Sequence, residues 1–340
     1  MGRGAGTVAV RWTHPAARRN AGFGGAPAAK TVYFACPGAK LRAMSVAVVI
    51  PVLNQLAYTQ GCVRCLQPDL AAGVRVIVVD NGSTDGTPQW LATQPSLKVI
   101  RNEQNRGCAP AWNQGVAAAG VLRKTPVSSG NTPDPSLRNT QGTVSALDWV
   151  VVLNNDVLLP AGWLAALLGA ADRHGLDVVC PAMRERDQNY DFESYARDFT
   201  AKLGSVVRRE GAHGVCFAVR RAVFEKIGGF DEAFRIGQFE DADFFRRARL
   251  AGFRTGVVGA CFIHHFGSVT QDALSDTKKQ RPYEAENRAY FRKKWKLGWA
   301  RRRWEKAIDG LRAWWWRTTE RARFGHTLHE KWDGERLRFY

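Results

Sequence analysis

The sequence predicts an α/β protein in which helices flank a mostly parallel central sheet. Four apolar runs are the candidate strands, at residues 46–50, 74–79, 97–100 and 149–153. Three stretches with helical patterns separate them, near residues 55–67, 87–94 and 108–119. The apolar runs are continuous, which is typical of strands covered on both faces. Strands that alternate with helices indicate a parallel sheet, an architecture that often binds nucleotides.

The formal net charge of +18 is concentrated at the two ends of the chain. Residues 1–43 hold seven Lys and Arg and no acid, while residues 287–340 hold sixteen basic and six acidic residues. The segment between them is therefore nearly neutral. Proteins that track phosphates spread basic residues over the binding face itself. We therefore do not expect nucleic acid as a partner of the central segment.

The seven cysteines are odd in number and scattered, which predicts reduced, buried thiols. Cys62 and Cys65 have the spacing of a redox or half-zinc motif, but no second pair follows them. No apolar run approaches the roughly 18–20 residues that span a bilayer, and the N-terminus lacks a secretory apolar stretch. We expect a soluble or membrane-peripheral protein on the cytoplasmic side.

Composition divides the chain into a central domain with two basic ends. Residues 1–43 are expected to be disordered, either as an organelle transit segment or as an extension upstream of a natural start at Met44. The domain is expected to cover residues 44–286, with a donor half to about 160 and an acceptor half from about 161. Within it, residues 123–146 predict a mobile insertion, and residues 287–340 predict a basic, Trp-rich helical tail.

The first candidate site residue is Asp80, which follows an apolar run and precedes a turn rich in Gly and Ser. Open parallel sheets bind ligands at the carboxyl ends of their strands, so this carboxylate is placed to accept hydrogen bonds from a base or ribose. The same pattern fits a plain strand-to-helix turn with Asp85 as the helix cap. The motif alone leaves both interpretations open.

A second polar group, Asn154-Asn155-Asp156, follows another predicted strand of the same sheet. Carboxylate and amide oxygens are suitable ligands for Mg²⁺ or Mn²⁺, which bridges the diphosphate of a sugar nucleotide and neutralises the leaving group. An Asn-Asn-Asp run is by itself more often part of a turn than of a metal site. Its position at a second strand end of one sheet favours a metal site.

Three acids, Glu240, Asp241 and Asp243, lie within four residues at the start of a predicted helix. Acids in a first turn are favoured by the helix dipole, which is the structural explanation for them. The cluster also suits a general base that deprotonates an acceptor hydroxyl, because neighbouring acids raise each other's pKa. Capping alone would need only one of the three.

The adjacent histidines His264 and His265 lie in a predicted strand. Neighbouring strand residues point to opposite faces, so at most one of them enters the site. A neutral imidazole is a suitable further ligand for an ion such as Mn²⁺, and a purely structural role is the alternative.

Together these segments resemble the family 2 glycosyltransferases, inverting enzymes of the GT-A fold, over roughly residues 45–270. The matching segments occur in order, as VVIPVLN at 48–54, DNGSTDG at 80–86, NEQNRG at 102–107, AWN at 111–113, LNNDV at 153–157, GGFDEAF at 228–234 and EDAD at 240–243. Several ordered matches of this length are highly specific.

The resemblance implies transfer of one sugar from a nucleotide-diphosphate sugar to a glycan or lipid-linked glycan, assisted by Mn²⁺ or Mg²⁺. It makes Asp80 a contact to the base or ribose, Asp156 the metal ligand and Asp241 the base, with Glu240 beside it. One of His264 and His265 would be the metal-binding histidine. Further nucleotide-sugar contacts would be Pro51, Asn54, Asn81, Asn105, Gly107, Asn113, Asn154 and Asn155. The donor would be UDP-, dTDP- or GDP-linked.

Two positions depart from the family pattern. Asn154 replaces the first carboxylate of the DxD-type motif, a variant common in rhamnosyltransferase-like bacterial relatives and suggestive of deoxysugar or O-antigen-type chemistry. Trp112 stands where many relatives have Arg. The Gln-x-x-Arg-Trp signature of processive synthases is absent, since Ala300 stands in the Gln position before Arg303-Trp304. Single-sugar transfer is therefore favoured.

The sequence leaves two alternatives to a glycosyltransferase open. A nucleotidyltransferase uses a similar sheet and metal, but it should show a Gly-rich phosphate loop after the first strand, where this chain has Pro51-Val52-Leu53-Asn54. The other alternative is a non-enzymatic adaptor that acts through the tail. Tryptophans and cations alternate in residues 287–340, which suits an anionic membrane surface, packing onto the domain or, less well, stacking on single-stranded nucleic acid.

Overall fold

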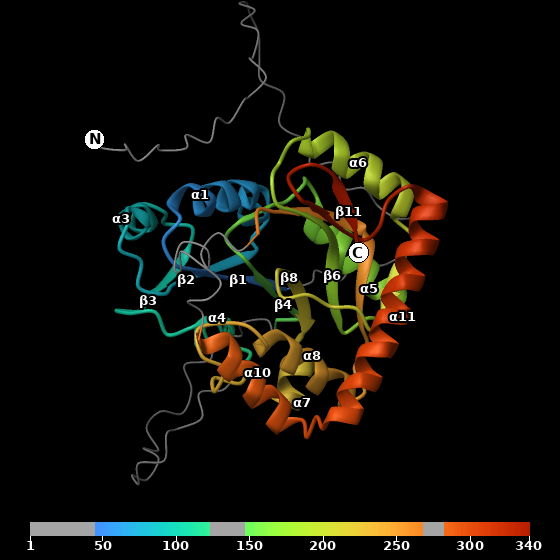
Figure 1. Cartoon of the computed structure of the whole chain (residues 1–340). Helices are drawn as coiled ribbons and strands as arrows, with labels where there is room; N and C mark the ends of the chain where they lie inside the picture. The colour runs from blue at the N-terminus through green and yellow to red at the C-terminus, as the bar shows by residue number, and fades with distance from the viewer. Residues whose placement is uncertain (1–44, 123–146, 268–281) are drawn as a thin grey trace, which may run out of the picture. The chain divides into compact units, whose positions relative to one another are not determined.

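The computed structural model describes residues 45–122, 147–267 and 282–340 (Figure 1). The N-terminal extension expected at 1–43 and the insertion expected at 123–146 lie outside the described residues. A single mixed sheet crosses the described domain in the strand order β11-β10-β6-β8-β4-β1-β2-β3, and β5, β7 and β9 pair with it off this path.

The first half of the chain forms the parallel part of the sheet. Its strands are β1 (Val46–Val52), β2 (Arg75–Asp80), β3 (Lys98–Arg101) and β4 (Trp149–Leu153). Strand β1 lies between β2 and β4, and all three pairings in this half are parallel. The carboxyl ends of β1, β2 and β4 therefore meet at one edge of the sheet, as the four apolar runs predict.

The second half mixes strand directions. Its strands are β5 (Val157–Leu158), β6 (Val178–Glu185), β7 (Val207–Arg209), β8 (Cys216–Arg220) and β9 (Thr255–His265). Strand β8 is antiparallel to both β4 and β6, whereas β9 pairs parallel with β6 and antiparallel with β5 and β7. The short β5–β9 ladder brings the end of β9 next to the end of β4.

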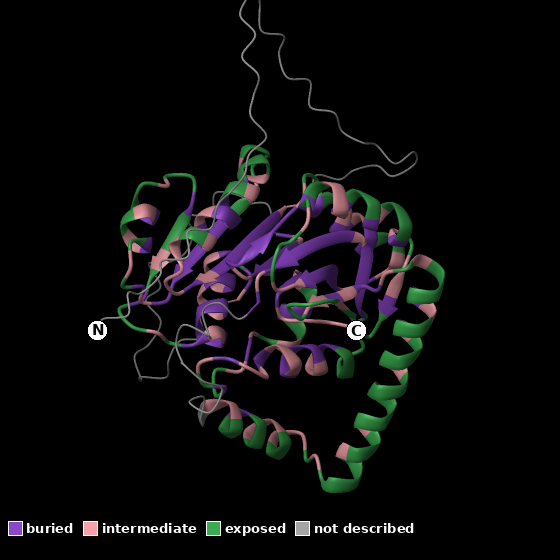
Figure 2. Ribbon diagram, turned by 45° about the horizontal axis from the view of Figure 1, so that its top comes forward, coloured by how far each residue is buried: buried purple, intermediate pink, exposed green. Residues whose placement is uncertain are grey.

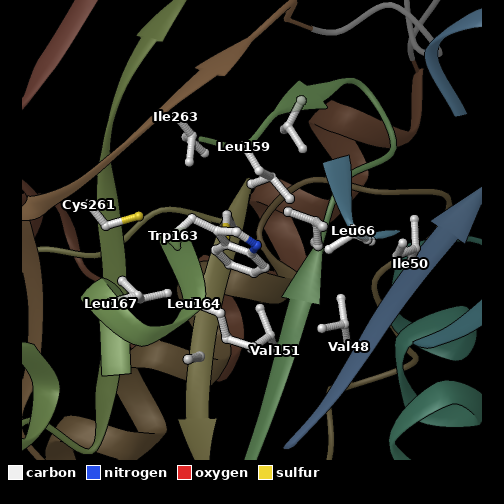
Figure 3. Packing of buried hydrophobic residues seen from close by; sticks show 14 of the residues in the cluster. Val48, Ile50, Leu66, Val151, Leu159, Trp163, Leu164, Leu167, Cys261 and Ile263 are labelled. Atoms are coloured by element: carbon white, nitrogen blue, oxygen red, sulfur yellow. The ribbon is translucent and has the colours of Figure 1, made fainter. Parts of the chain in front are cut away.

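Helices cover both faces of this sheet, and the strand residues alternate between two hydrophobic layers. One layer joins Val48, Ile50 and Val151 to helices α1 (Leu56–Cys65), α3 (Thr87–Ala92) and α5 (Trp163–His174). Figure 3 shows Trp163 at the centre of this layer, close to Val151 and Leu159. The short helix α2 (Gln67–Ala71) follows α1 and supplies Asp69, which accepts a hydrogen bond from the Trp163 indole at 2.9 Å.

The opposite layer joins Val49, Val150 and Val152 to the remaining helices of the domain. These are α4 (Cys108–Ala118), α6 (Phe192–Leu203), α7 (Arg221–Ile227) and α8 (Glu240–Leu250). Helix α6 begins at Asp191, whose carboxylate accepts a hydrogen bond from the Ser194 amide at 2.7 Å. Because both faces are buried, neither face of β1 or β4 tolerates a polar residue before the strand ends.

The end of the chain differs from the expected helical tail. Helices α10 (Pro282–Lys294) and α11 (Trp299–Phe324) are followed by two strands, β10 (His329–Trp332) and β11 (Leu337–Phe339). Strand β10 pairs parallel with β6, and β11 pairs antiparallel with β10 at the edge of the sheet. Strands of three or four residues with mixed polarity carry little periodicity, so β10 is defined only by its pairing with β6 and β11 only by its pairing with β10.

Buried charges attach the tail to the domain. Arg208 on β7 donates two hydrogen bonds of 2.7 Å to the Glu320 carboxylate on α11, and both side chains are buried. Arg208 also donates to the carbonyl of Tyr340 at 2.7 Å, while Glu320 accepts from the Leu328 amide at 2.9 Å. One ion pair therefore holds helix α11, the turn before β10 and the last residue of the chain.

Removal of the Glu320 carboxylate should strongly destabilise the protein. Glu320→Ala leaves the Arg208 guanidinium buried without its partner, and breaking a buried pair in this way costs about 3–5 kcal/mol. Urea-induced unfolding followed by circular dichroism measures this loss. Glu225→Ala is the matched control, because it breaks a half-exposed pair with Arg221 worth about 0–1 kcal/mol. Equal losses in the two variants would contradict the anchoring role.

Candidate active site

A cavity of about 270 Å³ opens where the ends of β1 and β4 meet the start of α8 and the end of β9. It brings together residues that lie more than two hundred positions apart in the chain. The sequence-predicted site residues that line it are Pro51, Asn81, Asn105, Asn154, Asn155, Asp156, Glu240, Asp241 and His265. Five other predicted site residues do not line it, namely Asn54, Asp80, Gly107, Asn113 and His264.

Asp80 is buried behind the cavity rather than facing it. One carboxylate oxygen accepts a hydrogen bond from the Ser83 amide at 2.9 Å, and the other pairs with the guanidinium of Arg101. Arg101 also donates to the Ser83 carbonyl at 3.1 Å, and its side chain is half exposed. In this structure Asp80 therefore fixes the turn after β2 and orients Arg101.

Three asparagines connect the loops beneath the cavity. Asn54 has a positive φ of 56°, which Asn tolerates, and its side-chain oxygen accepts a hydrogen bond from the Thr84 amide at 2.7 Å. Asn81 donates to the side-chain oxygen of Asn105 at 2.9 Å and to the carbonyl of Gly107 at 3.1 Å. These bonds fix the loops after β1, β2 and β3 relative to one another.

Gly107 and Asn113 join the first half of the domain to the second. At Gly107 φ is +93°, and a Cβ there would lie 3.0 Å from the backbone nitrogen of Ile236. The next amide, of Cys108, donates to the Ile236 carbonyl at 2.7 Å. Asn113 donates to the carbonyl of Phe230 and accepts from its amide, both at 2.8 Å. These residues position the chain segment that precedes α8.

The carboxylate of Asp156 and the imidazole of His265 lie next to each other in the cavity wall. Their closest atoms, Oδ1 and Nε2, are 3.4 Å apart, while the His265 Nδ1 lies 3.3 Å from Glu185. Burial alone would lower the pKa of His265, but the charges of Asp156 and Glu185 outweigh it and raise the pKa to about 9.

The other histidine, His264, points away from the cavity. It is fully buried, its Nδ1 lies 2.8 Å from the Tyr190 hydroxyl, and burial lowers its pKa to about 3. The alternation expected of strand neighbours therefore separates the pair, and His265 is the one that lines the cavity.

Asp156 and His265 fit a divalent cation. The cavity-facing Nε2 of His265 is buried and forms no hydrogen bond with any described residue. Two neighbouring ligands at roughly 2.1 Å from one ion lie about 3 Å apart, close to the spacing of these two atoms. Glu185 behind the imidazole completes the carboxylate–histidine arrangement common at metal sites. Within the described ranges no three His, Cys, Asp or Glu form a complete cage, so further ligands would be phosphate and water oxygens.

The first turn of α8 places two acids against the cavity. Glu240 is 5% exposed, and its Oε2 has no partner among the described residues. Burial and the neighbouring charge of Asp241 raise the pKa of Glu240 to about 8, and burial also raises the pKa of Asp241. Asp241 is partly exposed, so it is the more accessible of the two.

The third acid of the cluster, Asp243, belongs to the tail contact instead. It is fully buried and accepts hydrogen bonds from Arg247 at 2.8 Å and from the Trp295 indole at 3.0 Å. The Nζ of Lys294 lies 2.7 Å from Oδ1 of Asp243, the oxygen that also accepts from Trp295. Asp243 therefore holds α10 against α8.

Several residues that shape the cavity were not predicted from the sequence. The unpredicted lining residues include Cys108, Gly214, Ile236 and Gln238. Ile236, Gln238 and Phe239 all have positive φ, between 60° and 82°, so the loop before α8 is strained where it meets the cavity. Only a glycine fits at position 214, because a Cβ there would lie 2.4 Å from Oδ2 of Asp241. These features depend on neighbours distant in sequence and leave no local signal.

One wall of the cavity is apolar. Trp112 is 3% exposed and packs against the rings of Phe230 and Phe217, with centroids 4.9 and 5.8 Å away. Trp112 therefore contributes apolar rather than charged surface to the cavity wall.

Comparison with known proteins identifies the family of this chain. The model of glycosyl transferase family 2 matches residues 47–120 and 137–242, more than half of the chain. The chain belongs to the family 2 glycosyltransferases. This membership confirms the predicted family, its GT-A fold and glycosyl transfer from nucleotide sugars as the reaction class. The nucleotidyltransferase and non-enzymatic adaptor interpretations are thereby set aside.

Two curated relatives of this glycosyltransferase come from bacterial glycan synthesis. It is 30% identical over 220 residues to the N-acetylglucosaminyl-diphospho-decaprenol L-rhamnosyltransferase of Mycobacterium tuberculosis, covering 56% of this chain and 66% of the relative. It is 26% identical over 227 residues to the succinoglycan biosynthesis protein ExoA of Rhizobium meliloti, covering 63% and 61%. The match thus spans just under two thirds of either relative's length.

Solved structures are similar at lower identity. Residues 1–349 of TarS from S. aureus are 17% identical, with a TM-score of 0.45 over 66% of this chain and 61% of that one. GalNAc-T7 with UDP, GalNAc and Mn²⁺ is 14% identical, with a TM-score of 0.45 over 65% and 43%.

Substitution of Gly214 should impair the site with little effect on the rest of the fold. Gly214→Ala places a methyl group on the Asp241 carboxylate, which must move, and sugar transfer should fall by about tenfold or more because small misplacements cost large factors in rate. Gly310→Ala is the matched control: nothing lies within 4 Å of its new Cβ, and alanine favours the helix by about 1 kcal/mol. Turnover and thermal unfolding of both variants are the measurements. Full activity in Gly214→Ala would refute this position for Asp241.

Proposed function

We propose that this glycosyltransferase moves one hexosyl or deoxyhexosyl unit from a UDP-, dTDP- or GDP-linked donor to a hydroxyl of a glycan or lipid-linked glycan, with inversion. The observation that carries the proposal is a single cavity lined on one side by Asp156 and His265 and on the other by Glu240 and Asp241. Residues suited to binding a diphosphate and residues suited to accepting a hydroxyl proton thus face the same cavity.

The donor side follows from the ends of β1 and β4. We assign the nucleotide-diphosphate to the region of Pro51, Asn81, Asn105 and Asn155, whose side chains line the cavity from the donor half. Asp156 and His265 would hold Mn²⁺ or Mg²⁺, which when bound neutralises charge on the departing diphosphate. Asn154 supplies an amide instead of a second carboxylate, so the protein itself contributes little negative charge to the cation.

The acceptor side follows from the first turn of α8. Asp241 takes the proton of the acceptor hydroxyl, and the hydroxyl oxygen then attacks the anomeric carbon from the face opposite the diphosphate. The bond from that carbon to the diphosphate oxygen breaks, which inverts the configuration. Burial raises the pKa of both Glu240 and Asp241, so the pair becomes fully charged only above neutral pH, and Asp241 is the more accessible of the two.

The relatives support the class of substrates. The name of the mycobacterial relative states transfer of L-rhamnose to a diphospho-decaprenol-linked sugar, and ExoA takes part in succinoglycan biosynthesis. We extend this to a deoxysugar or hexose donor and a lipid-linked or polysaccharide acceptor here. In the same proposal residues 44–160 bind the donor and residues 161–286 the acceptor, and the enzyme works at the cytoplasmic face of a membrane. Among the described residues no helix is long and apolar enough to cross a bilayer.

The first test concerns the metal ligand. Asp156→Ala should abolish sugar transfer, and it should also abolish the rise in melting temperature that Mn²⁺ with UDP, dTDP or GDP produces in the unchanged protein. The variant alone should still unfold cooperatively, because the carboxylate lies at the surface of the cavity and not in either hydrophobic layer. Asp172→Ala, which removes a half-exposed partner of Arg220, should keep both properties. Sugar transfer retained in Asp156→Ala would contradict the assignment of Asp156 as a metal ligand.

The second test concerns the base. A base acts when deprotonated, and burial raises the pKa of both acids, so kcat/KM should rise with pH and level off near or above pH 8. Asp241→Asn should lower kcat by about 10²–10⁴ and flatten this profile. Asp172→Asn should leave the rate and the profile unchanged. An Asp241→Asn enzyme that keeps the same pH profile at full rate would exclude Asp241 as the base.

A further inference from the structure

Helix α11 carries an exposed apolar stripe that the catalytic domain does not cover. Its members are Trp304, Ile308, Leu311 and Trp315, at spacings of four, three and four residues, so they share one helix face. Three of them are 60–68% exposed and Ile308 is 38% exposed. We call these four residues the tryptophan stripe. Figure 2 shows how largely exposed α11 is beside the buried sheet.

Most exposed large apolar side chains of the described residues are concentrated on this one helix. Trp299 and Trp314, which are 67% and 50% exposed, lie on the same helix outside the tryptophan stripe. Six of the nine large hydrophobic side chains that are exposed in the described ranges therefore belong to α11. Scattered apolar residues on a surface are ordinary, whereas a contiguous row of this kind marks a contact surface.

A different face of α11 makes its ion pairs with the domain. Glu320 pairs with Arg208, and Glu305 accepts from Arg246 at 3.0 Å. Arg312 pairs with Glu210 at 2.8 Å. Trp316, unlike its neighbours Trp314 and Trp315, lies under the guanidinium of Arg208, 5.4 Å from it. The tail tryptophans thus divide into those that pack on the domain and those that face outward.

The outward side of the helix is strongly basic. Residues 299–324 contain eight Lys and Arg and three acids, and two of those acids, Glu305 and Glu320, pair inward with Arg246 and Arg208. The exposed cations of the helix are Arg301, Arg303, Lys306, Arg317, Arg321 and Arg323. Two indole rings and two aliphatic side chains therefore form a row on a helix that carries exposed cations along its length.

We propose that this face of α11 docks the enzyme onto an anionic lipid bilayer. Indole rings prefer the boundary between headgroups and acyl chains, and long Lys and Arg side chains reach the phosphates while their stems stay apolar. The row is linear and runs along most of a single helix, whereas the core of a protein interface is a rounded patch surrounded by a polar rim. A straight row with cations on its flanks fits a plane of negative charge.

Docking through α11 also orients the catalytic cavity relative to the membrane. The helix ends at Gly325 and the chain continues into β10, which pairs with β6. His329 and Lys331 of β10 each lie 3.5 Å from the carboxylate of Glu185, the residue behind His265. Because these links are short and belong to one sheet, a bilayer that holds α11 also holds the cavity at a fixed height. This inference does not depend on the proposed donor or acceptor.

Sedimentation with lipid vesicles tests the proposal on the full chain. The protein should sediment with vesicles of phosphatidylglycerol and phosphatidylcholine in equal parts, but not with pure phosphatidylcholine vesicles, and added salt should release it. Combined Trp304→Ala and Trp315→Ala should weaken binding by at least about tenfold. Leu250→Ala, which removes an equally exposed apolar side chain from α8, is the matched control and should bind like the unchanged protein.

The same samples give the results that would overturn the proposal. Unchanged vesicle binding by the Trp304→Ala, Trp315→Ala variant would remove α11 from the interface. Failure of the unchanged protein to bind anionic vesicles would reject a membrane partner, and a dimer in analytical ultracentrifugation that this variant loses would assign the stripe to a second copy of the chain. Preferred binding to single-stranded DNA over vesicles would also reject it. Thermal unfolding of each variant checks that the fold is kept, and no step needs a donor or acceptor.

Discussion

Burial of both faces of the central sheet is the constraint on which the rest of the structure depends. Strands β1 and β4 are sealed between two hydrophobic layers, so polar side chains can emerge only where the strands end. Parallel pairing places those ends at one edge, and the β5–β9 ladder adds the end of β9. Asp156 and His265 meet there because polar side chains can reach the surface of this sheet only at the ends of its strands.

The cavity wall formed by the start of α8 depends on a second set of contacts that cross between the two halves of the domain. The loop before α8 is held by the Ile236 carbonyl, which accepts from Cys108, and by the close approach that Gly107 permits. Asn113 fixes the neighbouring segment, and Asp243 anchors the helix through α10. The strained backbone between Ile236 and Phe239 persists because these contacts hold it from both sides.

Sequence patterns predicted the parts of this enzyme that are local. The continuous apolar runs located β1 to β4, and motif order identified the family and most of the cavity lining. They do not show which way each side chain points or which groups it contacts within the protein. Asp80 and Asn113 are predicted ligand contacts, and in the structure they bond to Arg101, Ser83 and Phe230. The packing that sets these contacts comes from residues far away in the chain.

The same limit explains the missed elements. Gly214 is ordinary in sequence and becomes critical only beside Asp241. Strands β10 and β11 are too short and too polar to be predicted from the sequence. Strand β10 forms by pairing with β6, and β11 forms by pairing with β10. The adjacent histidines, in contrast, followed the simple alternation of a strand, and the structure resolves which of them faces the cavity.

The position of β10 has a consequence for folding. This strand pairs with Met183–Glu185 of β6, although β7, β8 and β9 lie between the two strands in the sequence. Until β10 is in place, these residues of β6 present unpaired backbone groups on one side, the kind of edge that recruits strands from other chains. Partly folded chains in which β10 is not yet paired are therefore the form most prone to aggregate, and chaperone binding should be concentrated on them.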